Sequence, residues 1–362
     1  MARKLFIEEI LAFSAAGIVI LITLMLYQNV FSPGETIFLM VRYFTFGYPF
    51  YNLFFFFIYL AYFWKFYLRL ASVISDAILQ KKPFPKGIAR EFIGYVLEPV
   101  RLLAPLVLVG LTFYTLLSRM SYELRFSGKD LLFLQADTSL FRVIPFVWLP
   151  SLLSPSFFST LFQVGYLSLG AVMSASLALL FLFFRPLLFR EAVLAFMISI
   201  ILAYPFFYFL PCQDPNNYFL RNLRGVSFPE EITEGLKSYH PSPPAAGFIA
   251  QIANAETNKE RDNAVPVSCF PSMHAVWAFF VIYFLALARR WSLALTIPWT
   301  VLLLAGGVYF AQHYVVDYIA AVPVAIASVY LAGLLLQLEE RIKRKNTPSG
   351  LEKKTMPAEG EI

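Results

Sequence analysis

The sequence predicts an all-α membrane protein, a polytopic bundle of transmembrane helices. Its 362 residues are 59% apolar and only 14% charged, and the mean hydropathy is +0.66. Soluble globular domains have a different balance, because charged residues make up about a quarter of them. The second observation is that the apolar residues fall into runs of about 20, the length that one helical crossing of a bilayer needs.

Eight apolar runs predict about eight transmembrane helices. A further apolar stretch, around 131–150, contains Asp137 and Arg142 and follows Asp130. Charged side chains inside a span are costly, so an interfacial or re-entrant element is expected there. The predicted spans are 8–30, 46–66, 99–118, 158–184, 189–210, 271–289, 292–311 and 315–337.

The basic residues predict the orientation, because Lys and Arg accumulate on the cytoplasmic side. With both termini in the cytoplasm, 19 of the 29 lysines and arginines fall in cytoplasmic segments or at the cytoplasmic ends of the spans. The first run starts with Glu8 and Glu9, is long and has no small-residue cleavage site, so we interpret it as a retained helix. The segments expected on the extracytoplasmic (periplasmic, lumenal or external) face are 31–45, 119–157, 211–270 and 312–314.

Two short motifs at the ends of predicted spans hold the candidate catalytic residues. In the first, Pro271 and Ser272 stand directly before the sixth span, where Pro fits the first helical turn and Ser fits the cap. A helix N-terminus binds phosphate readily. Ser272 would add a hydroxyl donor there, and His274 would supply a proton.

The second motif places His313 at the outer end of the seventh span and Asp317 at the outer start of the eighth. A carboxylate four residues beyond an imidazole can accept its N–H and make the other ring nitrogen a better nucleophile. An acid, a nucleophile and an orienting carboxylate suffice for phosphoryl transfer through a phosphohistidine. Such a mechanism needs no metal and no other cofactor.

Each of these residues also has a non-catalytic interpretation. A lone His at a membrane interface is commonly an amphipathic anchor, and an Asp at a helix start is commonly a cap. The predicted topology nevertheless places His274, His313 and Asp317 at one membrane depth and on one face. This coincidence favours a shared chemical role.

The segments CFPSMHAVWAF and YFAQHYVVDYIAAV resemble the second and third signature motifs of the type-2 phosphatidic acid phosphatase superfamily. The resemblance covers about residues 268–322. It implies a six-helix phosphatase-like core with its active site at the outer membrane surface. By the same resemblance, the family's nucleophile, orienting acid, general acid and phosphate ligand match His313, Asp317, His274 and Ser272.

The chain departs from the common phosphatase pattern in informative ways. Met273 stands where that pattern has Gly, Gly307 stands where it has Arg, and its Lys-x6-Arg-Pro motif is not found in an outer segment. The branch similar to inositol phosphorylceramide synthase also lacks those arginines. That branch typically shows Phe-Pro-Ser-Leu-His followed by His-Tyr-x-x-Asp, and this chain is closer to it.

Without those arginines, the phosphate charge must be neutralised by another group. Arg221 and Arg224 in the long outer loop are three residues apart and would share one face of a helix. They are therefore the candidate phosphate-binding residues. Anchoring to lipid head groups is an equally good interpretation of the pair.

The two cysteines stand at opposite ends of the long outer loop. Cys212 follows the fifth span and Cys269 precedes the sixth. Disulfides persist in oxidising compartments, and one here would contribute roughly 4 kcal/mol in the chain-entropy model. The alternative is two unrelated small apolar residues at membrane interfaces.

The chain is expected to divide into three parts: N-terminal transmembrane helices with a cytoplasmic amphipathic loop (1–98), the phosphatase-like or phosphotransferase-like membrane core (99–338, with the catalytic motifs in 211–322) and a disordered cytoplasmic tail (339–362). The activity favoured is lipid head-group transfer from a phospholipid or polyprenyl phosphate to an alcohol or polyol. Hydrolysis by water is the alternative, and a non-catalytic lipid-binding or transport protein is the second. Nothing in the sequence suggests nucleic-acid binding.

Overall fold

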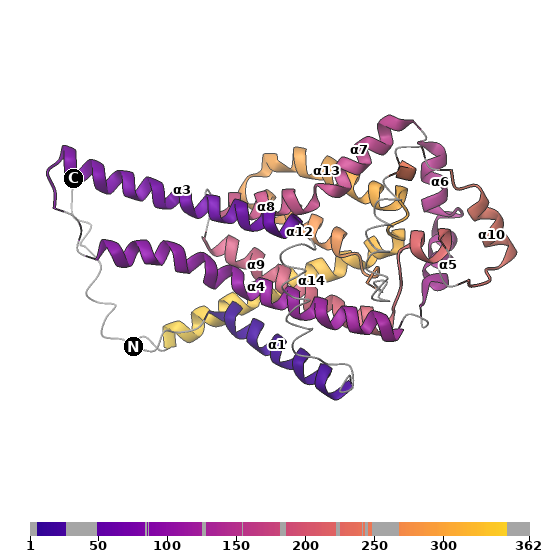
Figure 1. Cartoon of the computed structure of the whole chain (residues 1–362), viewed down its shortest axis with the longest axis horizontal. Helices are drawn as coiled ribbons and strands as arrows, with labels where there is room; N and C mark the ends of the chain where they lie inside the picture. The colour runs from indigo at the N-terminus through magenta and orange to yellow at the C-terminus, as the bar shows by residue number, and fades with distance from the viewer. Residues whose placement is uncertain are drawn as a thin grey trace.

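In the computed structural model, the named secondary-structure elements of the described residues are all helices (Figure 1). An isolated parallel bridge joins Cys212 to Ser268. The described residues are 6–26, 49–83, 85, 87–124, 128–153, 155–181, 186–221, 225–240, 242, 245–247 and 268–345. The α-helices are α1 (Ile7–Leu26), α3 (Pro49–Leu79), α4 (Ile88–Leu124), α5 (Asp130–Phe141), α6 (Pro145–Leu152), α7 (Ser156–Leu167), α8 (Leu169–Leu179), α9 (Pro186–Phe209), α10 (Glu230–Lys237), α12 (Met273–Ala288), α13 (Leu293–Tyr309) and α14 (Val315–Lys345).

Apolar helices of membrane-spanning length fit an integral membrane protein. Within the described residues, three helical segments are long and apolar enough to cross a bilayer: Leu187–Phe209, Arg290–Tyr309 and Val315–Lys345. The number rises to five if each of two bent helix pairs is one span. The predicted number of eight is therefore not confirmed. Residues 27–48, which contain the start of the second predicted span, lie outside the described residues.

Two of the predicted apolar segments are broken helices. α5 and α6 are bent by 54° at the break between them, in the stretch for which an interfacial or re-entrant element was expected. α7 and α8 are bent by 47° within the predicted span 158–184. The break between α5 and α6 coincides with Arg142, which has a left-handed backbone (φ 63°) and ends α5.

Helix α9 lies at the centre of the bundle (Figure 1). Seven consecutive residues, Ala192–Ile198, are buried, so every face of the helix is covered in this stretch. A helix that is apolar all round is expected in such a position. Its neighbours include α14, α4 and α12. Helices α9 and α14 lie side by side along much of their length.

An ion-pair network ties α1 to one end of α9 and α14. Arg190 binds Glu8 through two contacts of 2.7 Å and Glu339 through one of 2.6 Å. Beside them, Arg101 binds Glu9 at 2.7 and 2.6 Å. Charges that leave water are stable only when they are paired, so these contacts explain how Glu8 and Glu9 can begin an apolar helix. We refer to these five residues as the charged end.

Helices α3, α4 and α14 extend further than the sequence patterns predicted. Much of 65–101, expected as an amphipathic cytoplasmic element, belongs to α3 and α4, which Arg69 and Glu91 link by an ion pair of 2.7 Å. Residues 339–345 of the predicted disordered tail continue α14. Glu339 stabilises this extension, because it binds both Arg190 and Lys343. The rest of the tail, 346–362, lies outside the described residues.

Candidate active site

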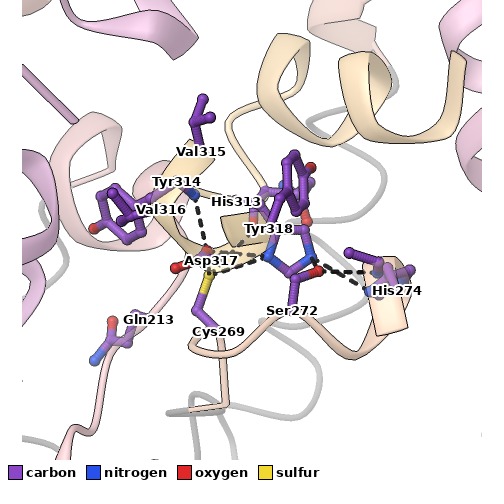
Figure 2. Close-up of polar contacts among 12 residues, drawn as sticks. Gln213, Cys269, Ser272, His274, His313, Tyr314, Val315, Val316, Asp317 and Tyr318 are labelled. Atoms are coloured by element: carbon purple, nitrogen blue, oxygen red, sulfur yellow. Dashed lines mark hydrogen bonds and ion pairs between the residues drawn. The ribbon is translucent and has the colours of Figure 1, made fainter. Parts of the chain in front are cut away.

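Three segments meet at the end of α9 that is opposite the charged end. They are the residues after α9, the chain that leads into α12, and the connection between α13 and α14. Figure 2 shows that Ser272, His274, His313 and Asp317 converge there. This arrangement agrees with the predicted topology, which places His274, His313 and Asp317 at one membrane depth and on one face.

His313 is at the centre of the cluster. Its Nε2 atom lies 3.3 Å from Ser272 Oγ and 3.3 Å from His274 Nδ1, and its Nδ1 atom lies 3.3 Å from Asp317 Oδ2. If Nδ1 carries the proton and donates it to the carboxylate, the Nε2 lone pair points toward Ser272 and His274. The nitrogen that could attack phosphorus would then face the other two candidate residues.

Burial keeps the His313 imidazole neutral. The side chain is 6% exposed, and removal from water lowers its pKa from 6.5 to about 3, since burial disfavours the charged ring. The contact with Asp317 is therefore a hydrogen bond from a neutral ring rather than an ion pair. A neutral imidazole is also the form that can act as a nucleophile.

Ser272 caps α12, as its position before the sixth predicted span indicated. Its Oγ atom accepts a hydrogen bond from the backbone N–H of Ala275 at 3.3 Å. The hydroxyl proton is thus available for another acceptor. The same side chain can hold the helix start and donate to a group beside His313.

Asp317 is both a cap and a neighbour of the histidine, so the two interpretations of this residue are compatible. Its Oδ2 atom accepts from the backbone N–H of Tyr314 at 2.9 Å and lies next to His313 Nδ1. The backbone of Ser272 donates to the Asp317 carbonyl at 3.2 Å, which links the two motifs directly. Oδ1 is buried and has no hydrogen-bond partner among the described residues.

Cys269 contacts both members of the His313–Asp317 pair. Its thiol donates to Asp317 Oδ2 at 3.0 Å and lies 3.3 Å from His313 Nδ1. The sequence suggested that Cys269 is half of a disulfide or a small apolar residue at the interface, and this contact was not predicted. The available signal was its position three residues before Ser272.

Cys212 and Cys269 are both free thiols in the structure. Their sulfurs and an Asp317 carboxylate oxygen lie within 4.8 Å of one another. These three groups could hold a metal ion only if the thiols lost their protons, and burial opposes this, since it raises the pKa of Cys212 to about 12. The disulfide stays a prediction, and the proximity of the two sulfurs is compatible with it.

Tyr166 of α7 orients the second histidine. Its ring stacks on His274, with centroids 5.0 Å apart and an interplanar angle of 16°. The same tyrosine lies close to Gly307 of α13. Nothing in the sequence indicated this role for Tyr166, because His274 and Gly307 are more than a hundred residues away along the chain.

The structure also explains the glycine that stands where the common pattern has an arginine. A Cβ atom on Gly307 would collide with the Tyr318 hydroxyl and lie 3.4 Å from both His313 Cδ2 and Tyr166 Cε2. The Tyr318 hydroxyl is fixed there, because it donates to the Leu304 carbonyl at 3.0 Å. A longer side chain at position 307 would need these tyrosines to move.

Of the two candidate phosphate-binding arginines, one is described. Arg221 is partly buried and its Nη1 atom donates to Asn217 Oδ1 at 3.1 Å. The segment that carries it reaches the site, since the backbone N–H of Asn216 donates to the Ala311 carbonyl at 2.8 Å. Arg224 lies outside the described residues.

Comparison with known families identifies the fold. A model of the PAP2 superfamily matches residues 133–331, which is more than half of the chain and includes both histidine motifs. The chain therefore belongs to the PAP2 superfamily, whose members are generally phosphatases or phosphotransferases. No characterised protein and no solved structure gave a significant match.

Proposed function

We propose that the protein is a membrane lipid phosphotransferase that works through a phosphohistidine on His313. The observation that carries the proposal is the placement of His313 between Asp317 at Nδ1 and His274 at Nε2, each at 3.3 Å. Membership of the PAP2 superfamily supports the reaction class. The membrane-length helices support a lipid substrate, a phospholipid or polyprenyl phosphate.

In the first half-reaction, His313 Nε2 attacks the phosphorus of the donor lipid. A phosphorus–nitrogen bond forms, and the bond from phosphorus to the departing alkoxide oxygen breaks. His274 gives a proton to that oxygen, so that it leaves as an alcohol. Asp317 stabilises the positive charge that develops on the His313 ring, as carboxylates beside catalytic histidines do.

In the second half-reaction, an acceptor resolves the phosphohistidine. His274 takes the proton of an incoming hydroxyl group, whose oxygen attacks phosphorus while the phosphorus–nitrogen bond breaks. An alcohol or polyol acceptor makes the protein a head-group transferase, and water makes it a phosphatase. The resemblance to the inositol phosphorylceramide synthase branch favours transfer.

Three groups are candidates for binding the phosphate oxygens. The first turn of α12 presents backbone N–H groups and the positive end of a helix dipole, and Ser272 adds a hydroxyl. Arg221 and Arg224 would supply the positive charge. If they do, Arg221→Ala should lower kcat more than it raises KM, because phosphoryl charge on the oxygens is greatest in the transition state.

We further propose that the site faces the extracytoplasmic side and that both termini are cytoplasmic. The excess of basic residues in the segments assigned to the cytoplasm supports this orientation. A membrane-impermeant probe that labels a single cysteine introduced at the exposed position His240 from outside would support it. Labelling only from the cytoplasmic side would overturn it.

The proposed function is tested by trapping the intermediate. Purified protein is mixed with phospholipid labelled at its phosphate, quenched, and examined for acid-labile phosphohistidine and for products with and without candidate alcohols. We expect His313→Ala to abolish both the intermediate and turnover, and His240→Ala, a change at an exposed loop histidine, to preserve them. EDTA should leave activity largely intact.

Each outcome separates the candidate functions. Product that shifts from free phosphate to a lipid ester when an alcohol is added indicates a transferase. Phosphate release that no alcohol diverts indicates a phosphatase. Lipid binding without turnover in the folded wild-type protein would favour the non-catalytic alternative, and wild-type rates in folded His313→Ala would contradict the mechanism.

A further inference from the structure

Helix α5 holds the backbone of the His313 motif from outside the motif. Asp137 accepts hydrogen bonds from the backbone N–H groups of Val315 and Val316, both at 2.9 Å. Asp130, the first residue of the same helix, accepts from the Tyr314 hydroxyl at 3.2 Å. The three residues between His313 and Asp317 are thus all bound by α5 (Figure 2 shows them beside the site).

The two Asp137 contacts act on the start of α14. Val315 and Val316 are its first two residues, and the first N–H groups of a helix have no acceptor within the helix. Asp137 supplies one carboxylate oxygen to each, and a negative charge at a helix N-terminus is favourable. Because both oxygens are used, the first turn is fixed in position and in rotation about the helix axis.

Asp130 fixes the preceding part of the motif and a second segment of the site. Its Oδ1 atom accepts from the backbone N–H of Gln213 at 2.8 Å as well as from Tyr314. Gln213 follows Cys212, whose sulfur lies in the cluster with Asp317. Asp130 and Asp137 are seven residues apart, two helical turns, and therefore lie on one face of α5.

We infer that Asp137, assisted by Asp130, is a positioning residue for the His313 nucleophile. The carboxylates of α5 hold the first turn of α14 so that Asp317 Oδ2 meets His313 Nδ1. Both are buried, with 0% exposure, and act through the motif backbone and Tyr314 rather than on the substrate. The inference rests on the proposed function, since it assigns the fixed geometry to phosphoryl transfer.

We call Asp130 and Asp137 the α5 clamp. This clamp explains how the 3.3 Å contact between His313 and Asp317 is held in place without a short ion pair. The connection from Phe310 to Tyr314 is a loop, and a loop by itself would let His313 move relative to Asp317. Misplacement of a catalytic group by about 1 Å can cost on the order of 100-fold in rate. Loss of the outer contacts that orient metal ligands typically costs about 10- to 100-fold in affinity or activity, and we expect an effect of the same order for this buried orienting contact.

The first test is Asp137→Asn. The amide keeps one acceptor oxygen but turns an NH₂ group toward the other backbone N–H, so one hydrogen bond is lost at nearly constant volume. We expect a 10- to 100-fold fall in kcat and in the rate of phosphohistidine formation, with KM changed less than threefold, because substrate contacts remain. These factors are about those of other orienting contacts.

Glu9→Gln is the matched control. It also converts a paired, mostly buried carboxylate to an amide, but at the charged end, where Glu9 binds Arg101. It should lower thermal stability and leave the phosphorylation rate of the folded protein unchanged. If Asp137→Asn fails to fold, Tyr314→Phe tests the other half of the clamp, since it removes only the hydroxyl that reaches Asp130; we expect a several-fold fall in phosphorylation rate.

Nitrogen NMR of histidine-labelled protein separates this inference from the proposed function. If wild type forms no phosphohistidine at position 313, the proposed function fails, and positioning is judged from the His313 ring signals alone. Asp137→Asn, or Tyr314→Phe in its place, should shift or broaden those signals, whereas Glu9→Gln should not. The inference would be overturned if folded Asp137→Asn or Tyr314→Phe protein gave the same His313 signals as wild type. Where the intermediate forms, its phosphorylation rate would also have to equal that of wild type.

Discussion

Buried charges are paired in opposite ways at the two ends of the α9–α14 pair. At the charged end, Arg190 binds Glu8 and Glu339 at 2.6 to 2.7 Å. At the other end, the His313–Asp317 contact is 3.3 Å and the second carboxylate oxygen has no partner among the described residues. The first arrangement neutralises its charges within the protein, and the second leaves a carboxylate available for the charge that a reaction would create.

The separation of the two ends fits a membrane. Asp317 and Glu339 lie in the same helix, α14, and 22 residues of α-helix rise by about 33 Å. The hydrocarbon core of a bilayer is about 30 Å thick. The site and the charged end therefore lie about one hydrocarbon thickness apart, which suits a site at one membrane surface and an ion network at the other.

The strength of charge pairing at each end matches the role of that end. Fully paired charges stabilise the position of α1 against the core but have no capacity for a further partner. A buried carboxylate that faces a neutral imidazole has no cationic partner, and this lowers stability. The same carboxylate can stabilise the imidazole when the ring becomes positive during catalysis.

The largest effect is expected from Asp317→Asn. The amide cannot supply the charge that stabilises a positive His313 ring, so kcat should fall by about 10⁴-fold, as for the equivalent change in a Ser-His-Asp triad. The protein should remain folded. Glu8→Gln, the same change at the charged end, should leave kcat within about threefold of wild type. Equal losses of activity in both variants, measured by initial rates, would contradict the division of roles.

The next effect is on stability. Arg190→Ala leaves Glu8 buried without its partner, and breaking a buried ion pair in this way costs about 3–5 kcal/mol. Chemical unfolding in micelles should show this loss, while the fraction that remains folded keeps its activity. Lys343→Ala is the control, because Lys343 is half-exposed where it binds Glu339 at 2.9 Å. Its loss should cost about 0–1 kcal/mol.

A smaller effect is expected from Gly307→Ala. The added methyl group meets the Tyr318 hydroxyl and crowds His313, and such overpacking typically costs about 1–3 kcal/mol. We expect lower thermal stability and roughly a tenfold lower kcat. Gly333→Ala in α14 is the control, since its nearest neighbour would be Glu191 Oε1 at 3.6 Å. That change should be neutral or stabilising by up to about 1 kcal/mol.

The smallest expected effect is a pH dependence of stability. Burial lowers the pKa of His313 to about 3, so between about 6.5 and about 3 the unfolded chain binds a proton that the folded protein does not. The free energy of unfolding therefore falls as the pH falls through this window. Unfolding at pH 7 and pH 5 should show a smaller decrease in His313→Gln than in wild type, by on the order of 1–2 kcal/mol. An equal decrease in both proteins would show that His313 titrates normally when folded.

Local rules predicted the parts of the site that depend on neighbouring residues. The Ser272 cap follows from the residue types at a helix start, and the His313–Asp317 contact follows from a four-residue spacing. The convergence of the two motifs could be predicted because a membrane places the ends of successive spans at defined depths. The predicted number of eight spans was not confirmed, because the described residues hold three to five candidate spans. The bend between α7 and α8 also could not be predicted, since composition does not show where a helix breaks.

Contacts between distant segments could not be predicted in the same way. The hydrogen bonds from Val315 and Val316 to Asp137 join residues 178 and 179 positions apart, and the stacking of Tyr166 on His274 joins α7 to α12. The sequence marked Asp130 and Asp137 only as charges that weaken a span. Their spacing of seven residues was the one signal that both face the same neighbour.

From its sequence, this chain could be predicted to be a helical membrane protein, and its two motif histidines and the aspartate could be singled out. Those conclusions depend on the transfer of side chains from water to lipid and on spacing along single helices, which a chain carries at every position. Only the folded protein shows that Cys269 contacts Asp317, that Tyr318 excludes a side chain at Gly307, and that Asp137 of α5 binds the start of α14. Those contacts depend on which helices pack together, and packing is a property of the whole bundle.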